Sequence, residues 1–291
     1  TGQVSGTITD PSGSAVAGAK VEMVNKQTRQ ARDTKSDNSG HFVFTEILPG
    51  TFSLTVDASG FEKFEQQEVV VSATERVALP VTLQVGEVTE TVSVNGEVAQ
   101  VQTTSAEHSG LITSREMQEI PLKGRSYMGT AKLLPGVIDT ANRESPGWND
   151  LVGINISGTR AGSIDLNLDG ITSLDTGSMT GPYLAPSIDA VAEVKVLLSN
   201  YQAEYGRSSG GTINTVIKSG TRDFHGGAYY FFRNEDMNAN EWLNNRGGLP
   251  RPRYRFNNPG YLAGGPVLLP FTKFNHDRDK LFSSGRRIFC R

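Results

Sequence analysis

The residues from Gly206 to Gly210 spell G-x-S-x-G, the pattern that surrounds the nucleophilic serine of many hydrolases. Such a serine needs a buried strand before it, a helix after it, and a histidine and an acid elsewhere in the chain. Here Ser208 is followed by TINTVIK, in which apolar residues alternate as in a strand. The chain has four histidines, each outside any context typical of a catalytic base: His41, His108, His225 and His276. The sequence therefore predicts no catalytic role for Ser208 and no enzyme.

A second stretch with possible chemistry is Asp165-Leu-Asn-Leu-Asp-Gly170, which imitates the first half of a calcium-binding loop. That loop ends in a glutamate at its twelfth position, and Thr176 occupies the position here. Ile164, Leu166 and Leu168 alternate through the stretch, which is typical of a strand that buries one face. We therefore expect a strand here, with no metal ion and no cofactor.

The bulk properties narrow the class of protein. The chain has 291 residues, enough for two or three domains, and a net charge of −3 that gives no field for binding nucleic acid. Its one cysteine, Cys290, excludes an intramolecular disulfide and a thiolate metal cluster. No run approaches the ~20 apolar residues that a membrane-spanning helix needs, but β-barrel strands leave a weaker signal.

Residues 1–86 show about seven short alternating stretches separated by turns, which predicts a small antiparallel β-sandwich. GTITDPSGSAVAGAKVEMVN and DNSGHFVFTEILPGTFSLTVDASGF resemble the carboxypeptidase regulatory-like domain, a transthyretin-like sandwich. The matching residues are Gly6, Asp10, Pro11, Gly13, Gly18, Ala19, Gly40, Phe42, Leu48, Pro49, Gly50, Gly60 and Phe61. That fold is grouped with carbohydrate-binding-like sandwiches, but we expect the aromatic residues to lie in the core or against the next domain: Phe42, Phe44, Phe52, Phe61 and Phe64.

Three further regions follow the sandwich. Residues 87–105 form a polar, proline-free segment with no evident strand partner, either an exposed linker or a strand that awaits pairing. Residues 106–220 mix helix and strand, with a capping box at Thr113–Glu116 ahead of a short helix, as in a compact α+β domain. Residues 221–291 hold two aromatic alternating stretches around a polar loop, which fit a membrane barrel and a soluble sheet edge equally well.

Three ordered motifs in residues 87–226 carry a second resemblance. IPLKGRSYMGTAKLLPGV, INISGTRAGSIDLNLDGI and SIDAVAEVKVLLSNYQAEYGRSSGGTINTVIKSGTRDFHG closely resemble the plug domain of TonB-dependent outer-membrane receptors. The Oar-like group of that family also carries the regulatory-like sandwich in front. The resemblance implies a mainly β, multidomain protein with a transthyretin-like sandwich, an α+β plug and the start of a transmembrane β-barrel.

The same resemblance implies a location, partners and sites. It implies the outer membrane of a Gram-negative bacterium with the N-terminal domains facing the periplasm, and as partners TonB, membrane lipid and a carbohydrate or peptide substrate. A TonB box, which adds as a strand to TonB, is expected at Glu90, Thr91, Val92, Ser93 and Val94. A junction between plug and barrel is expected at Gly206, Gly210, Gly211 and Gly220, where glycine lets the backbone bend and approach closely.

The chain departs from the family in length. A receptor of this kind closes a barrel of roughly 22 strands, and two or three fit here. The end also differs, because Ser283–Arg287 is polar where relatives continue with an aromatic strand. We therefore expect the N-terminal portion of a receptor, from a truncated or frame-shifted gene or a partial record, that does not transport by itself. The alternative is a non-catalytic binding module that uses the carbohydrate-binding-like sandwich to hold carbohydrate or another domain.

Overall fold

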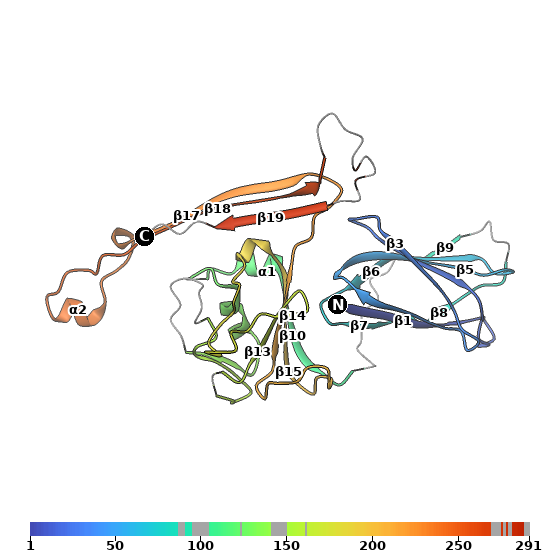
Figure 1. Ribbon diagram of the computed structural model, residues 1–291, viewed down its shortest axis with the longest axis horizontal. Coiled ribbons are helices and arrows are strands. Elements are labelled where there is room, and N and C mark those ends of the chain that lie inside the picture. Colours follow the sequence, from blue (N-terminus) through green and yellow to red (C-terminus); the bar gives the residue numbers. More distant parts are fainter. Residues whose placement is uncertain are drawn as a thin grey trace. The chain divides into compact units, whose positions relative to one another are not determined.

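The computed structural model describes residues 1–86, 91–94, 105–122, 124–140, 150–160, 162–268, 275, 278 and 281–287, and only the backbone of 91–94 and 284–287. The chain forms two compact units, Thr1–Lys218 and Ser219–Arg291. The described residues are mainly strands with a few short helices (Figure 1). No helix among them is long and apolar enough to cross a membrane.

The N-terminal region is a sandwich of two β-sheets, here called the sandwich (Figure 1). In one sheet β1 pairs with β4, β7 and β8, and the other has the order β3-β2-β5-β6-β9. The strands are β1 (Gly2–Thr9), β2 (Lys20–Asn25), β3 (Ala31–Lys35), β4 (His41–Ile47), β5 (Gly50–Asp57), β6 (Lys63–Val71), β7 (Arg76–Ala78), β8 (Val81–Thr82) and β9 (Thr91–Val94). Every second residue of β1 is buried, so the alternation in the sequence becomes one wall of the core.

The core of the sandwich follows the sequence prediction closely. Val21 and Met23 share the buried face of β2, as their spacing predicts. Phe42, Phe44 and Phe52 are buried, and two further aromatic residues pack against the core while partly exposed: Phe61 and Phe64. The prediction that these rings lie in the core or pack against it is confirmed. The strand β3 (ARDTK) was not predicted, because its residues do not alternate between apolar and polar.

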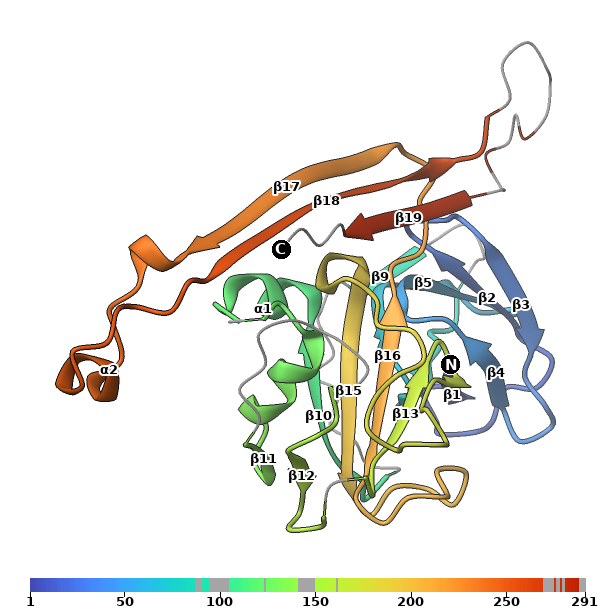
Figure 2. The same cartoon turned by 60° about the vertical axis from the view of Figure 1, so that its left-hand side comes forward.

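Residues 105–218 form a second α+β arrangement, here called the middle fold. Its main sheet has the order β10-β15-β16-β13-β14, and Figure 2 shows β15, β16 and β13 running side by side. A separate pair is β11 with β12. The elements are β10 (His108–Thr113), α1 (Ser114–Glu119), η1 (Tyr127–Leu133), β11 (Val137–Asp139), β12 (Ile154–Ile156), β13 (Asp165–Leu168), β14 (Ile171–Thr172), η2 (Ile188–Ala190), β15 (Val191–Ser199) and β16 (Thr212–Ile217).

The helices of the middle fold cover one face of this sheet with apolar side chains. Met117 of α1 and Tyr127 of η1 are 1% exposed, and they join one core with Val194 and Val196 of β15. The predicted capping box is confirmed: the Thr113 hydroxyl accepts from the Glu116 N–H, and the Glu116 carboxylate accepts from the Thr113 N–H at 2.8 Å. This reciprocal pair satisfies two backbone N–H groups at the start of α1 and so sets where the helix begins.

Asp169 and Gly170 form the two-residue turn of the β13–β14 hairpin. Leu168 pairs with Ile171, and both turn residues have positive φ, 50° and 82°. An Asp-Gly dipeptide suits such a turn, because glycine and aspartate tolerate that backbone region better than other residues. The aspartate-rich stretch is therefore a strand and a hairpin turn.

The second unit is built around three antiparallel strands, here called the C-terminal sheet, in the order β17-β18-β19. Its elements are β17 (His225–Asn234), η3 (Glu235–Met237), α2 (Trp242–Arg246), β18 (Arg255–Pro266) and β19 (Leu281–Arg287). The ladder between β17 and β18 is unbroken from His225↔Gly264 to Asn234↔Arg255. The polar residues Ser283–Arg287, which stand where relatives are expected to have an aromatic strand, lie in β19 and pair with β18.

Candidate functional site

The candidate TonB-contact segment lies mostly in β9. Glu90 is outside the described residues, while Thr91–Val94 pair in parallel with β6. The register sets Thr91 beside Lys63, Val92 beside Phe64, Ser93 beside Glu65 and Val94 beside Gln66. Of the two alternatives for this segment, an exposed linker or a strand that awaits pairing, Thr91–Val94 form a strand, and its partner is β6. The pairing could not be foreseen, because a ladder between segments distant in the sequence leaves no local signal.

The predicted junction glycines differ in how closely the chain packs around them. A Cβ on Gly210 would lie 2.5 Å from Thr159 Oγ1 and 2.8 Å from the Ser163 carbonyl oxygen. A Cβ on Gly211 would collide with the Leu197 carbonyl oxygen, and Gly211 has a φ of 96°. Only glycine satisfies both conditions at Gly211.

The other two junction glycines lie in different surroundings. No atom lies within 4 Å of the place where a Cβ on Gly206 would be. In the second unit, a Cβ on Gly220 would meet the backbone of Phe282 in β19. Close backbone approach therefore requires glycine at Gly210, Gly211 and Gly220, whereas Gly206 stands in open space.

Ser208 holds the loop that leads into β16. Its Oγ lies 2.5 Å from the carbonyl oxygen of Ser163 and 2.8 Å from that of Gly211, so its single proton is donated to one or the other. The chain then continues as the strand β16, from Thr212, where a nucleophile elbow would continue as a helix. The hydroxyl thus has a structural role in the turn.

The aspartates of the calcium-like stretch are held by protein groups. Asn167 Nδ2 donates to Asp165 Oδ2 at 3.3 Å and to Asn214 Oδ1 at 3.2 Å, and Asp169 Oδ1 accepts from the Ile217 N–H at 2.9 Å. No group of three His, Cys, Asp or Glu side chains suited to a metal ion occurs in the described part of the chain. These hydrogen bonds tie β13 and its turn to β16.

A largely buried ion pair between Arg125 and Asp189 lies near the end of β16, and the sequence did not predict it. Both carboxylate oxygens of Asp189 accept from Arg125 Nη2, at 2.8 and 2.9 Å. Lys218 Nζ donates to the Asp189 carbonyl oxygen at 2.8 Å, and burial lowers the pKa of Lys218 while Asp189 opposes that change. An aspartate within the apolar pattern SIDAVAEV was the available signal, because a buried charge needs a partner.

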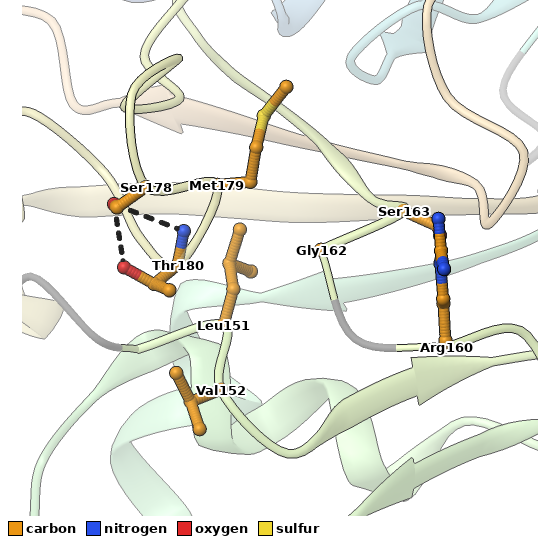
Figure 3. A pocket seen from close by; sticks show the side chains of 8 residues that line it. All are labelled: Leu151, Val152, Arg160, Gly162, Ser163, Ser178, Met179 and Thr180. Carbon is orange, nitrogen blue, oxygen red and sulfur yellow. Dashed lines mark hydrogen bonds between the residues drawn. The ribbon is translucent and has the colours of Figure 1, made fainter.

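A pocket of about 380 Å³ opens among three loops of the middle fold (Figure 3). Its lining comes from residues 151–152, 160–163 and 178–180, described apart from residue 161. The Ser178 and Thr180 hydroxyls hydrogen-bond to each other at 2.7 Å, and Arg160 contributes a guanidinium. The lining offers hydrogen-bond donors and the apolar side chain of Met179.

Comparison with known proteins finds relatives of the sandwich, of the C-terminal sheet and of most of the chain. Residues 3–84 match the carboxypeptidase regulatory-like domain, and residues 216–286 match an outer membrane beta barrel domain. The chain is 24% identical over 234 residues to the TonB-dependent transporter Oar of Myxococcus xanthus, a match that covers 77% of this chain and 21% of Oar. The chain thus spans about a fifth of the length of this relative.

Two solved receptors resemble the structure over half of the chain. The siderophore receptor PirA of Pseudomonas aeruginosa has a TM-score of 0.40 at 17% identity, covering 55% of this chain and 24% of the receptor. The outer membrane transporter YddB of Escherichia coli has a TM-score of 0.40 at 17% identity, covering 54% of this chain and 24% of the transporter.

The two family matches define an outer-membrane protein that carries a regulatory-like sandwich ahead of barrel strands. Together with the similarity to Oar, these matches make the chain similar to a portion of a TonB-dependent outer-membrane receptor. The predicted fold class is confirmed. The chain is mainly β, with the sandwich at the N-terminal end and, at the C-terminal end, barrel strands that do not close a barrel among the described residues.

Proposed function

We propose that this chain supplies the gate and the partner-contact segment of a TonB-dependent receptor. In this proposal the middle fold is the plug, the C-terminal sheet is the start of the barrel wall, and Glu90–Val94 contact TonB on the periplasmic side. Substrate bound from outside shifts the plug, and TonB then pulls on the segment with energy from the inner-membrane proton gradient. The similarity to Oar supports this class of function.

The observation that carries the proposal is the change in environment between two successive strands. β16 is buried over Thr212–Thr215, whereas β17 exposes Tyr230, Phe231 and Phe232 by 60%, 43% and 56%. Consecutive strand residues point to opposite faces, so both faces of β17 present aromatic rings. A soluble sheet rarely exposes rings on both faces, but a barrel wall meets lipid on one side and protein on the other.

The contact with TonB depends on the backbone of the segment. An added strand is recognised mainly through main-chain N–H and C=O groups, so the side chains can vary while an amide hydrogen and an extended conformation are needed. Proline removes the amide hydrogen and alanine keeps it, so a pair of variants at one position separates backbone from side-chain recognition.

The test is binding of the purified periplasmic domain of TonB to the full chain in detergent. The wild type and Val92→Ala should bind with affinities within about threefold, and Val92→Pro should lose at least about tenfold. Equal binding by Val92→Pro would remove this segment as the contact. The unaltered sandwich and middle fold, checked by circular dichroism, serve as the control for folding.

Transport itself needs a closed barrel, because open strand edges are not tolerated in hydrocarbon. The described residues contain three strands of the C-terminal sheet, far from the roughly 22 of a plugged transporter. We therefore expect the 291-residue chain in liposomes to give no more solute entry than protein-free liposomes. Solute entry that depends on the chain would refute this part of the proposal.

A further inference from the structure

β9 is the last strand of a five-stranded sheet. The order β3-β2-β5-β6-β9 gives it a neighbour on one side, β6, and no described strand pairs with its other side. In a parallel ladder the backbone groups of successive residues point alternately to the two sides. Half of the N–H and C=O groups of Thr91–Val94 therefore point away from β6, along an open edge.

The two edges of this sheet differ in how they are protected. The opposite edge strand, β3, carries Arg32, Asp33 and Lys35 within five residues. Charged residues on an edge strand discourage another strand from adding to it. β9 reads Thr-Val-Ser-Val, with no charge and no proline, so it lacks that protection. Among the described strands, this sheet is thus protected from strand addition at β3 and unprotected at β9.

Pairing with β6 also prepares β9 for recognition. Fixing an extended segment costs conformational entropy, and a partner that binds a strand already in a sheet does not meet that cost again. The ladder with β6 fixes the extended conformation and leaves the outer groups in the spacing that another strand needs. The open edge therefore fits one kind of partner, a domain that offers an unpaired edge strand.

We infer that the sandwich presents β9 as a docking strand, so that an edge strand of TonB adds beside β9 as the sixth strand of this sheet while β6 keeps its place. The inference rests on the proposed contact between this segment and TonB. It gives the sandwich a role in partner binding: the sandwich and the segment form one docking surface.

A reversible cross-link between β6 and β9 tests the inference in the full chain. Glu65 and Ser93 are register partners, and neighbouring strands lie about 4.8 Å apart, within the Cα range of about 4.4–6.8 Å for disulfides. The variant is Glu65→Cys/Ser93→Cys with Cys290→Ser, oxidised with diamide or reduced with dithiothreitol. Lys63→Cys/Thr91→Cys, at another pair of register partners, provides an independent lock.

Binding of the TonB periplasmic domain is compared between the oxidised and reduced states of the same protein. We expect the disulfide to form and the oxidised chain to bind within about threefold of the reduced chain. A loss of about tenfold or more on oxidation, restored by dithiothreitol, would show that β9 must leave β6 and would overturn the inference. Failure of both disulfides to form would overturn it as well.

The cysteine substitutions could themselves block binding of TonB. Hydrogen exchange on the unaltered chain tests the inference without them. On addition of the TonB domain, the amides of β9 should gain protection while those of Lys63–Gln66 keep theirs. Loss of protection in Lys63–Gln66 on binding contradicts the docking surface but leaves the proposed TonB contact intact. No binding of TonB to the unaltered chain rejects both.

Discussion

Lys195 Nζ lies 2.6 Å from Glu107 Oε1, and the two side chains are only 5% and 3% exposed. Val194 and Val196, the neighbours of Lys195 in β15, belong to the core, so Lys195 lies on the other face of the sheet. The pair joins the segment that enters β10 to the adjacent strand. A buried charge left without its partner is much more costly than a buried pair replaced as a whole.

Removing one member of this pair should therefore harm the middle fold more than removing both. Lys195→Met should lower the free energy of unfolding by about 3–5 kcal/mol, because Glu107 remains buried and charged. Lys195→Met/Glu107→Leu should recover most of that loss. Urea titrations of the three proteins measure the difference. A double variant as unstable as the single variant would contradict the prediction.

The junction glycines give a matched pair of substitutions. Gly211→Ala should destabilise the chain by about 1–3 kcal/mol, because its φ is 96° and the new Cβ would meet the Leu197 carbonyl oxygen. Gly206→Ala is the control, since no atom lies within 4 Å of its added Cβ, and it should change stability by less than about 0.5 kcal/mol. Thermal unfolding of both variants provides the test, and similar melting temperatures would refute it.

The capping box should make the stability of α1 depend on pH. Hydrogen bonds from the Thr113 N–H and hydroxyl hold the pKa of Glu116 below its ordinary value of 4.5. The ionised carboxylate is therefore the form that the fold favours, and its stabilising effect is present above pH 4.5 and is lost as the pH falls through the lower folded value.

Two variants separate the contribution of the Thr113 cap from that of the Glu116 charge. Thr113→Ala should cost about 1 kcal/mol at neutral pH, the usual value for a lost helix cap. Glu116→Gln should lower stability at neutral pH, and its difference from the wild type should shrink as the pH is lowered toward 3. A difference that is constant between pH 7 and pH 3 would show that the carboxylate charge does not matter.

Ser208→Ala distinguishes a structural hydroxyl from a nucleophile. Loss of the hydrogen bond to the Ser163 or Gly211 carbonyl should cost about 1 kcal/mol of stability. Neither the wild type nor the variant should accelerate the hydrolysis of a p-nitrophenyl ester above its spontaneous rate. Hydrolysis by the wild type that disappears in the variant would revive the catalytic interpretation.

Features set by near neighbours in the sequence were predicted well. The capping box of Thr113 and Glu116 spans one helical turn, and the shared face of Val21 and Met23 follows from the two-residue period of a strand. The aromatic stretches of β17 and β18 also became strands in register. In each case the interacting residues lie close together in the sequence, so the local sequence pattern predicts the structure.

Features set by distant pairing were missed. Ile154–Ile156 pairs with β11 and Asp165–Leu168 lies parallel to β16, and neither partner was predicted. The contact of Arg125 with Asp189 joins residues far apart in the chain. The pairing of β9 with β6 is another contact between segments distant in the sequence that was not predicted. Local patterns specify that a strand forms, whereas the choice of neighbour depends on the packing of the whole sheet.

The order of the main sheet gives the middle fold a weak end and a strong end. β10, on the N-terminal side, is bound to β15 alone, and the buried Lys195–Glu107 pair stands at its entrance. β16, on the C-terminal side, is bound to β15 and to β13 at once. Tension on the chain ahead of β10 is resisted by one ladder and the Lys195–Glu107 pair, and loss of both detaches that strand while the remaining four stay joined to one another. The same tension applied after β16 must break two ladders together.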